Sequence, residues 1–253
     1  MTLWILGGLD PTGGAGVLRD RRVAAELAPA LEIVAVITAV TQQGDGRPAR
    51  SLATPPARLA AALAGVPDAT GVKLGLVPTS CVSVVAAALA RVHAPRVLDP
   101  VLRASDGGDL GASVEGLLRL APQVDLITPN GAEAAALLGE LPRDDDALLV
   151  AAGRLGGAAV LFKNVSGEDP AWVRDRLVSG GRCIEFRRPR GPEVDPRGTG
   201  CALATAITCG LAAGRGMLDA CGAAIAWLDT ARTRTYPGPD GRPHLASPEL
   251  DEV

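Results

Sequence analysis

Two glycine-rich segments contain residue types that can bind a phosphate-bearing ligand. The first follows the apolar run at residues 1–8 and reads Gly8-Leu9-Asp10-Pro11-Thr12-Gly13-Gly14-Ala15-Gly16. Glycines let the backbone approach a ligand closely, and a helix that begins directly after them offers unpaired N–H groups to anions. The segment is not a Walker A loop, because no Gly-Lys-Ser or Gly-Lys-Thr follows, and it is not a GxGxxG loop. Four glycines in nine residues favour a ligand loop over a plain strand-to-helix turn.

The second segment is Gly198-Thr199-Gly200-Cys201, which precedes an apolar stretch at residues 202–207. A helix that starts here would direct its free N–H groups and the positive end of its dipole at a ligand. The same dipole would lower the pKa of Cys201 and make its sulfur more thiolate-like. An equally good interpretation is a structural helix start that buries a small cysteine.

A third segment combines an amide and a carboxylate at helix-capping spacing. Asn130 is followed three residues later by Glu133, which is a variant of the capping box. Capping is the simpler interpretation. A binding role is compatible with it, because a helix N-terminus at the carboxyl edge of a sheet also faces the ligand cleft.

Isolated polar residues stand among apolar neighbours at five further positions. They are Asp20, Gln43, Lys73, Asp99 and Lys163. Asp20 lies about one turn into the first predicted helix. Lys73 and Lys163 lie within or at the end of apolar strands, where a buried lysine is rare unless it is paired.

The elements that must position these residues follow from hydrophobic patterning. Apolar runs that predict strands buried on both faces lie at residues 3–6, 33–40, 72–76, 96–99, 125–128 and 158–162. Helices are predicted at residues 16–27, 57–63, 80–92, 131–138, 146–155, 201–213 and 218–230. Alternation of strands and helices predicts a mostly parallel sheet covered by helices. Residues 164–197 are expected to be mostly loop and edge strand, and the tail from Tyr236 to be irregular.

Ligands bind to such a sheet outside the carboxyl ends of its strands. Polar or glycine-rich segments follow the predicted strands at residues 7–16, 41–46, 99–108 and 128–133. We therefore expect these segments to meet in one cleft. No linker divides the chain, so residues 1–253 are expected to form a single domain.

Composition excludes several classes of protein. A net charge of −3 gives no broad basic surface for nucleic acid, and apolar runs are too short to span a bilayer. The four arginines at positions 187, 188, 190 and 197 favour a solvated loop, with a local anionic ligand as the alternative. The N-terminus lacks a signal peptide, five cysteines form no CxxC pair, and two histidines are too few for a His-based zinc site. These features predict a reduced, cytoplasmic protein.

Taken together and in this order, the segments resemble the hydroxymethylpyrimidine/phosphomethylpyrimidine kinase family of the ribokinase-like superfamily. The loop at residues 8–16 looks like the family's N-terminal loop, and Gly198-Thr199-Gly200-Cys201 matches its GTGC motif. Between them lie matches to four more segments, namely Thr38-Ala39-Val40-Thr41-Gln42-Gln43, Val72-Lys73-Leu74-Gly75-Leu76, Leu98-Asp99-Pro100-Val101, and Ile127-Thr128-Pro129-Asn130 with Glu133. Most sugar kinases of the superfamily carry Asp at the position of Cys201, so the cysteine shifts the expected substrate toward a hydroxymethyl heterocycle.

The resemblance implies an α/β fold, a ribokinase-like three-layer α/β/α sandwich with a mostly parallel central sheet. It implies ATP-dependent phosphorylation of hydroxymethylpyrimidine and of its monophosphate in thiamine biosynthesis, with ATP and Mg²⁺ as cofactors. It also suggests a homodimer that binds small molecules and neither nucleic acid nor membrane.

Roles for individual residues follow from the same resemblance. The pyrimidine pocket would be lined by Gly8, Ala15, Asp20, Gln43, Leu76 and Val101. The nucleotide would be bound by Asn130, Glu133, Lys163 and Thr199, with Glu133 also near Mg²⁺. The catalytic group would be Cys201, which orients or deprotonates the substrate hydroxyl, together with Gly198 and Gly200, whose N–H groups stabilise the transferring phosphoryl oxygens.

The chain departs from the family pattern in three places, one of which is Val194-Asp195-Pro196-Arg197 before the GTGC motif, where the family commonly has a Thr/Asn/His-rich approach. The family's KGGH after the late strand is replaced by Lys163-Asn164-Val165-Ser166, and Pro239 stands where a C-terminal lysine that helps bind phosphate is expected, with Arg242 and Arg197 as candidate substitutes. These departures leave two alternatives beside the pyrimidine kinase. One is a non-catalytic pyrimidine-binding protein of the same fold, and the other is a pyridoxine-type vitamin kinase.

Overall fold

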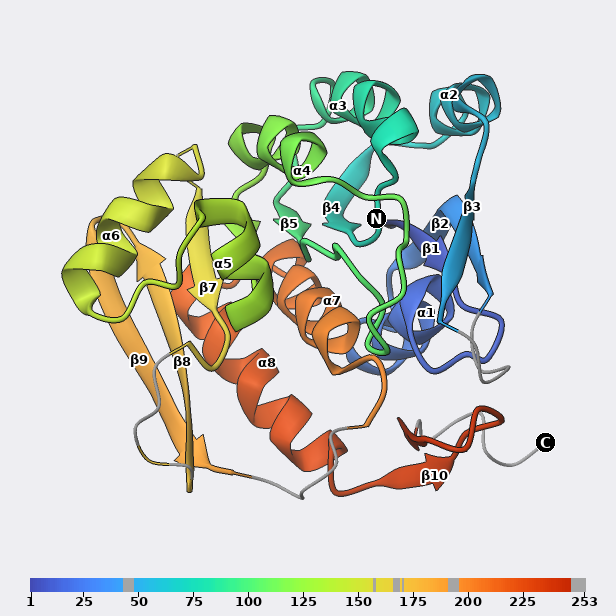
Figure 1. The fold of residues 1–253 in the computed structure, drawn as a ribbon. Helices are drawn as coiled ribbons and strands as arrows, with labels where there is room; N and C mark the ends of the chain where they lie inside the picture. Colours follow the sequence, from blue (N-terminus) through green and yellow to red (C-terminus); the bar gives the residue numbers. More distant parts are fainter. Residues whose placement is uncertain (43–47, 157, 166–168, 170, 191–195, 247–253) are drawn as a thin grey trace.

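The computed structural model describes residues 1–42, 48–156, 158–165, 169, 171–190 and 196–246 (Figure 1). Its main feature is a nine-stranded sheet in the order β3-β2-β1-β4-β5-β6-β7-β8-β9. The parallel strands are β1 (Thr2–Leu9), β2 (Glu32–Gln42), β4 (Ala69–Leu74), β5 (Arg96–Leu98), β6 (Leu126–Ile127) and β7 (Ala159–Phe162). Antiparallel strands close both edges, namely β3 (Arg50–Ala53) at one and β8 (Trp172–Ser179) with β9 (Arg182–Pro189) at the other.

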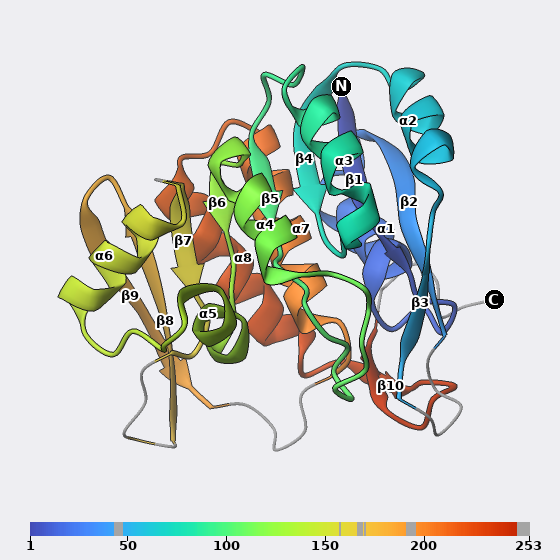
Figure 2. The ribbon, with the colours of Figure 1, turned by 45° about the horizontal axis from the view of Figure 1, so that its top comes forward.

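Helices cover both faces of the sheet, as Figure 2 shows. One face is packed against α1 (Gly16–Leu27), α7 (Thr199–Ala212) and α8 (Met217–Ala231). The other face is packed against α2 (Pro56–Ala64), α3 (Val82–Leu89), α4 (Val114–Leu120), α5 (Gly131–Leu138) and α6 (Asp145–Arg154). The result is a three-layer α/β/α sandwich, which confirms the predicted fold class.

Strand β1 shows why continuous apolar runs predicted the centre of this sheet. Successive side chains of a strand point to opposite faces. Trp4 and Leu6 belong to the core under α2–α6, whereas Leu3 and Ile5 belong to the core under α1 and α7. All four side chains are buried. A strand with a helical layer on each side has no solvent face, so it carries no polar alternation.

All six predicted strands and all seven predicted helices are present, and α1 and α5 have the predicted bounds. Two bounds shift noticeably. The predicted strand at residues 72–76 is β4, which starts earlier and ends at Leu74, and the predicted helix at residues 80–92 is a 3-10 turn (Thr79–Cys81) followed by α3.

Several elements lie outside the predicted ranges, among them the edge strand β3. Helix α4 is only seven residues long, and its signal is a Ser113 cap whose hydroxyl accepts the N–H of Gly116. The 164–197 region, expected to be mostly loop and edge strand, contains the eight-residue strands β8 and β9 at one edge of the sheet, although their bounds were not predicted. The tail, expected to be irregular, contains the hairpin of β10 (Thr235–Pro237) and β11 (Pro243–Leu245). Within the described residues, no helix is long and apolar enough to cross a membrane.

Candidate active site

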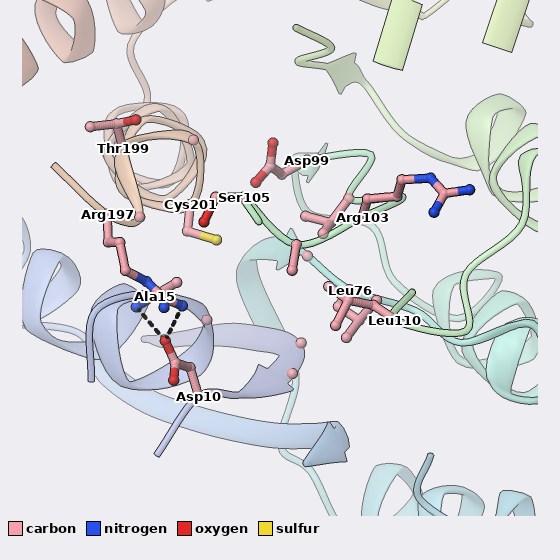
Figure 3. A pocket seen from close by; sticks show the side chains of 18 of the residues that line it. Asp10, Ala15, Leu76, Asp99, Arg103, Ser105, Leu110, Arg197, Thr199 and Cys201 are labelled. Atoms are coloured by element: carbon pink, nitrogen blue, oxygen red, sulfur yellow. Dashed lines mark hydrogen bonds and ion pairs between the residues drawn. The ribbon is translucent and has the colours of Figure 1, made fainter. Parts of the chain in front are cut away.

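The carboxyl ends of the central strands surround a cavity of about 280 Å³ (Figure 3). Its walls come from the segments after β1, β4, β5, β6 and β7, from the start of α7 and from the C-terminal hairpin. Lining residues include Gly8, Asp10, Thr41, Leu76, Asp99, Val101, Asn130, Glu133, Lys163, Cys201 and Arg242. The expected convergence at one edge of the sheet is confirmed for residues 7–16, 99–108 and 128–133, and for Thr41 of the segment 41–46.

Eleven of the residues expected in the site line this cavity. They are Gly8, Ala15, Leu76, Val101, Asn130, Glu133, Lys163, Gly198, Thr199, Gly200 and Cys201. Their individual binding roles stay predictions. Gln43, expected to contact the pyrimidine, lies outside the described residues.

Asp20 is not among the lining residues, although the pyrimidine pocket was expected to include it. Its carboxylate is fully buried and pairs with Lys73 at 2.6 Å between Oδ2 and Nζ. Its other oxygen accepts the hydroxyl of Thr205 at 2.8 Å. Both oxygens therefore have partners inside the protein, and the side chain that reaches the cavity from this pair is Lys73.

The two glycine-rich segments pack directly against each other. Gly198 has a φ of +78°, and a Cβ there would lie 2.2 Å from the carbonyl oxygen of Gly14. Gly16 has a φ of +61°, and a Cβ there would lie 2.2 Å from the carbonyl oxygen of Gly8. These positions need glycine for backbone conformation and for close backbone contact. The glycines are thus explained first by loop packing, and that packing brings the starts of α1 and α7 to one cavity.

A buried network of charges fixes the first loop relative to the second. Asp10 accepts the N–H groups of Thr12 at 3.0 Å and Ala15 at 3.1 Å. Arg197, next to the Gly198 turn, donates to Asp10 at 2.8 Å (Figure 3). Arg197 also pairs with Asp240 of the C-terminal hairpin at 2.7 Å. Three distant parts of the chain are therefore joined at one guanidinium.

Helix α7 begins at this junction without a side-chain cap. Its N-cap residue, Gly198, is left-handed and caps no N–H group. The free N–H groups of the first turn and the helix dipole favour an anion here. This geometry supports the expectation that the turn faces phosphate groups.

The predicted lowering of the Cys201 pKa is wrong. Burial raises the pKa of this thiol to about 12, although the Lys73 ammonium and the N–H of Gly16 act in the opposite direction. Desolvation of a thiolate outweighs the dipole of α7, which the sequence pattern alone could not weigh. Cys201 is therefore a thiol at neutral pH, and its sulfur points into the cavity (Figure 3).

Three charged groups lie on the side of the cavity formed by β5, β6 and β7. Lys163 Nζ pairs with Asp99 Oδ1 at 3.1 Å, and both groups lie about 3.5 Å from where a Cβ on Gly200 would be. Burial raises the pKa of the nearby Glu133 carboxyl to about 7, although Lys163 acts to lower it. These charges therefore adjoin the anion-favouring start of α7.

Asn130 and Glu133 form a complete capping box at the start of α5. The Asn130 side chain accepts the N–H of Glu133, and the Glu133 carboxylate accepts the N–H of Asn130, both at 2.9 Å. Both residues also line the cavity, so the capping interpretation is confirmed and is compatible with a binding role, which stays a prediction.

The carboxylates of Glu133 and Asp99 fit a magnesium ion that is held mainly by substrate. No group of three or more His, Cys, Asp or Glu side chains suited to a metal occurs within the described residues. Mg²⁺ in phosphoryl-transfer sites usually takes only one or two carboxylates, with phosphates and waters as its other ligands. A partly desolvated carboxylate such as Glu133 gains from a nearby cation.

The replacement of the family's KGGH segment has a backbone explanation at Asn164. This residue has a φ of 49°, in the left-handed region. Asn adopts this conformation more readily than most residues, so it can replace a glycine there. Its N–H donates to Asp175 at 2.9 Å. The backbone after Lys163 thus keeps a conformation that suits glycine without containing one.

Several lining residues were not predicted as part of the site. They are Asp10, Arg103, Ser105 and Leu110, with Lys73 and Asp99 noted only as isolated polar residues. Arg197 and Arg242, named above as candidate substitutes for the expected lysine, also line the cavity. Arg242 reaches the cavity through a hairpin that sequence patterning did not reveal. The other arginines of the predicted cluster lie on or beside β9, where Arg187 stacks on Trp172 and Arg188 pairs with Asp175.

The chain is similar in sequence to known kinases of thiamine biosynthesis. The family model described as phosphomethylpyrimidine kinase matches residues 10–242. The hydroxymethylpyrimidine/phosphomethylpyrimidine kinase of Streptomyces coelicolor is 33% identical over 240 residues, which cover 92% of this chain and 88% of that protein. The multifunctional thiamine biosynthesis protein ThiED of Corynebacterium efficiens is 32% identical over 240 residues, 89% of this chain but only 32% of that protein.

Among solved structures, the pyridoxal kinase of Staphylococcus aureus in complex with ADP is similar with a TM-score of 0.84. The match covers 100% of this chain and 95% of that one at 21% sequence identity. At that identity the similarity shows a shared fold and nothing finer.

The buried pair of Lys73 and Asp20 generates a stability prediction. Lys73→Met removes one partner and leaves a buried carboxylate uncompensated, so we expect the free energy of unfolding to fall by about 3–5 kcal/mol. The double variant Lys73→Met/Asp20→Asn removes both charges and is expected to lose less than the sum of the two single losses. Urea denaturation followed by circular dichroism measures each value.

The matched control is Arg96→Met, which breaks the partly exposed Arg96–Asp125 pair. That substitution is expected to cost no more than about 1 kcal/mol. Equal losses for Lys73→Met and Arg96→Met would contradict the role assigned to the buried pair.

Proposed function

The chain belongs to the phosphomethylpyrimidine kinase family, and on this basis we propose that it transfers the γ-phosphoryl group of ATP to hydroxymethylpyrimidine and then to the resulting monophosphate, in thiamine biosynthesis. The observation that carries this proposal is the single cavity that unites the uncapped start of α7, Cys201 and the Lys163–Asp99–Glu133 group. Such a cavity has an anion site, a hydroxyl-orienting group and a charged nucleotide side within reach of one another.

In the proposed reaction, the substrate hydroxyl oxygen attacks the γ-phosphorus in line, the bond to the ADP oxygen breaks, and the hydroxyl proton passes late to an oxygen of the transferred phosphoryl group. The N–H groups of Gly200 and Cys201 at the start of α7 stabilise negative charge on the transferring oxygens. Lys163 offers its ammonium to the phosphates, and Gly198 and Thr199 complete the turn around them. Glu133 would help to hold Mg²⁺, which would supply positive charge to the phosphates of the nucleotide. Positioning and electrostatics therefore account for most of the rate.

Cys201 is assigned to orienting the hydroxyl rather than to removing its proton in advance. Because burial raises its pKa to about 12, its thiolate is scarce at neutral pH. A thiol can accept and donate a weak hydrogen bond, which suffices to aim a hydroxyl group. Gly8, Ala15, Leu76 and Val101 are proposed to form the pyrimidine side of the cavity, with Gln43 as a further contact.

Two finer aspects belong to the same proposal. We propose a homodimer, supported by apolar side chains exposed on the edge formed by β2 and β3, where Val40 pairs with the 78% exposed Leu52. We also propose a cytoplasmic enzyme, supported by five cysteines that are all free thiols.

The function is tested by incubating the purified protein with Mg·ATP and hydroxymethylpyrimidine and following products by mass spectrometry. We expect monophosphate first and diphosphate later. Monophosphate alone would restrict the proposal to the first step. Tight binding of the pyrimidine without any product would overturn it in favour of a non-catalytic binding protein, and faster phosphorylation of pyridoxine would favour a pyridoxine-type kinase.

Cys201→Ala tests the orienting role. We expect kcat to fall by about 10²-fold, at the low end of the range for general acid–base groups, because the residue aims the hydroxyl and is not the main base. Cys183→Ala, which changes a thiol on β9 away from the cavity, is the control and should leave kcat as it is. Full turnover of Cys201→Ala in steady-state assays would remove Cys201 from the mechanism.

The raised pKa of Glu133 predicts that the apparent affinity for Mg²⁺ depends on pH. Its carboxyl has a pKa raised to about 7, so it is largely protonated at pH 6 and ionised at pH 8. Only the ionised form attracts Mg²⁺, so apparent Mg²⁺ affinity should rise between pH 6 and pH 8. Glu133→Gln should weaken that affinity and flatten its pH dependence. The measurement is a Mg²⁺ titration of the rate at fixed ATP, and an unaltered pH slope in Glu133→Gln would contradict the assignment.

A further inference from the structure

Strand β8 carries a buried carboxylate in the middle of an apolar face. Successive side chains of a strand point to opposite faces, so Val173, Asp175 and Leu177 share one face. All three are buried, and Asp175 is only 1% exposed. Burial of a charge is unfavourable unless the charge is paired and hydrogen-bonded. An apolar side chain would fit this position more simply, so the carboxylate has to be explained by its contacts.

Both carboxylate oxygens of Asp175 have partners. Oδ1 accepts the backbone N–H of Asn164 at 2.9 Å. Oδ2 pairs with the guanidinium of Arg188 on β9 at 2.5 Å, and that guanidinium also lies 2.8 Å from Asp229 of α8. The pair with Arg188 compensates the buried charge, and the bond to Asn164 connects it to the segment that follows β7.

Asn164 has a backbone conformation that needs support. Pairing between β7 and β8 ends at Phe162 and Arg176, and beyond this point the Asp175 side chain accepts the N–H of Asn164. Among the described residues, Asn164 is the one non-glycine residue with a positive φ, 49°. A hydrogen bond to a charged acceptor is strong enough to offset this left-handed conformation, which is unfavourable for most residues.

The turn at Asn164 separates two side chains that go to different places. Lys163, directly before the turn, lines the cavity. Val165, directly after it, is buried in the core under α2–α6. A change of conformation at Asn164 therefore changes where the Lys163 side chain can point.

Lys163 lies beside the start of α7. Its backbone N–H donates to the carbonyl oxygen of Pro129 at 2.8 Å. Its ammonium pairs with Asp99 at 3.1 Å and lies 3.5 Å from where a Cβ on Gly200 would be. The ammonium and the free N–H groups of α7 are thus neighbours. Groups that bind one anion together have to be held within about 0.5 Å of their productive geometry.

We propose that Asp175 is a positioning residue, which holds the turn at Asn164 and so keeps the Lys163 ammonium in place to bind the phosphates of the nucleotide. This inference rests on the proposed function, in which Lys163 faces those phosphates. Asp175 is not among the described residues that line the cavity, so it acts through Lys163 and touches no substrate. The asparagine that stands in place of the family's glycine makes the support more important, because glycine adopts the left-handed conformation without help.

Steady-state kinetics of Asp175→Val test the inference. Valine suits the apolar face, and Arg188 keeps Asp229 as a partner. Loss of the bond to the Asn164 N–H is expected to raise KM for Mg·ATP by about 10-fold, while KM for hydroxymethylpyrimidine changes far less. Asp175→Asn keeps an acceptor for this N–H without the charge, so it should fall between Asp175→Val and the wild type. Equal rises in both KM values would overturn the inference.

A double-mutant cycle separates action through Lys163 from a purely structural role. Lys163→Met removes the ammonium, so adding Asp175→Val to it should cause almost no further rise in KM for Mg·ATP. Effects that multiply in the double variant would overturn the inference. The control is Asp125→Ala, which removes a carboxylate that accepts the backbone N–H of Arg96 at the amino end of β5, away from the cavity. It should leave both KM values as they are.

Asn164 provides a second test that leaves the buried carboxylate intact. Its side chain is exposed, so substitution there disturbs no core packing. Asn164→Val places a β-branched residue at a positive φ, which such residues rarely adopt, and should raise KM for Mg·ATP as Asp175→Val does. Asn164→Gly retains the conformation and should raise it much less. Equal KM values for these two variants would overturn the inference even if Asp175→Val does not fold.

Calorimetric titration with Mg·AMP-PCP keeps the inference testable without turnover. Weaker binding in Asp175→Val and Asn164→Val, with much less change in Asn164→Gly, supports the positioning role. Unchanged binding in all three variants overturns it. Absence of any product from the wild type, by contrast, counts against the proposed function.

Discussion

The buried ion pair between Lys73 and Asp20 is the interaction on which the architecture of the site depends. Lys73 belongs to β4 and Asp20 to α1, and Thr205 of α7 donates to the same carboxylate. One carboxylate therefore links the central sheet to both helices whose first turns face the cavity. Burial acts against both charges and raises the pKa of Asp20, but the attraction of Asp20 together with that of Cys201 and Asp99 keeps the pKa of Lys73 raised, so the ammonium is retained inside the protein. Such a pair contributes little net stability but penalises every arrangement that separates its partners.

A second network of charged residues holds the loops of the site together, as the Lys73–Asp20 pair holds the sheet and the helices together. Asp10, Arg197, Asp240 and His244 connect the first glycine loop, the turn before α7 and the C-terminal hairpin. The space around His244 is tight, because a Cβ on Gly14 or on Gly238 would lie within 2.6 Å of its ring. Residues more than two hundred positions apart in the sequence are thus joined in one network.

The sequence predicted the features that depend on hydrophobic periodicity or on residues close together in the chain. Continuous apolar runs located the parallel strands, and the Asn130–Glu133 capping box fixed the start of α5. Topology alone predicted that the segments after these strands would meet. What depends on three-dimensional burial was not predictable: the raised pKa of Cys201 follows from desolvation, and the buried pairing of Asp20 with Lys73 joins two segments that are far apart in the sequence. Edge strand was expected within residues 164–197, but the bounds of β8 and β9 were not predicted, because charged residues such as Arg174, Arg176 and Glu185 interrupt the apolar pattern at a solvated edge of the sheet. Arg242 could not be placed without the hairpin that carries it.

The protonated state of Cys201 has a consequence for how this enzyme can be inactivated. Peroxides, disulfides and electrophilic drugs react with thiolates, and a thiol whose pKa is raised to about 12 offers almost none at neutral pH. The cysteine at the centre of the cavity is thus shielded from oxidative stress without being hidden from substrate. A covalent inhibitor aimed at it would need its selectivity from reversible recognition of the surrounding walls, since the sulfur itself contributes little reactivity.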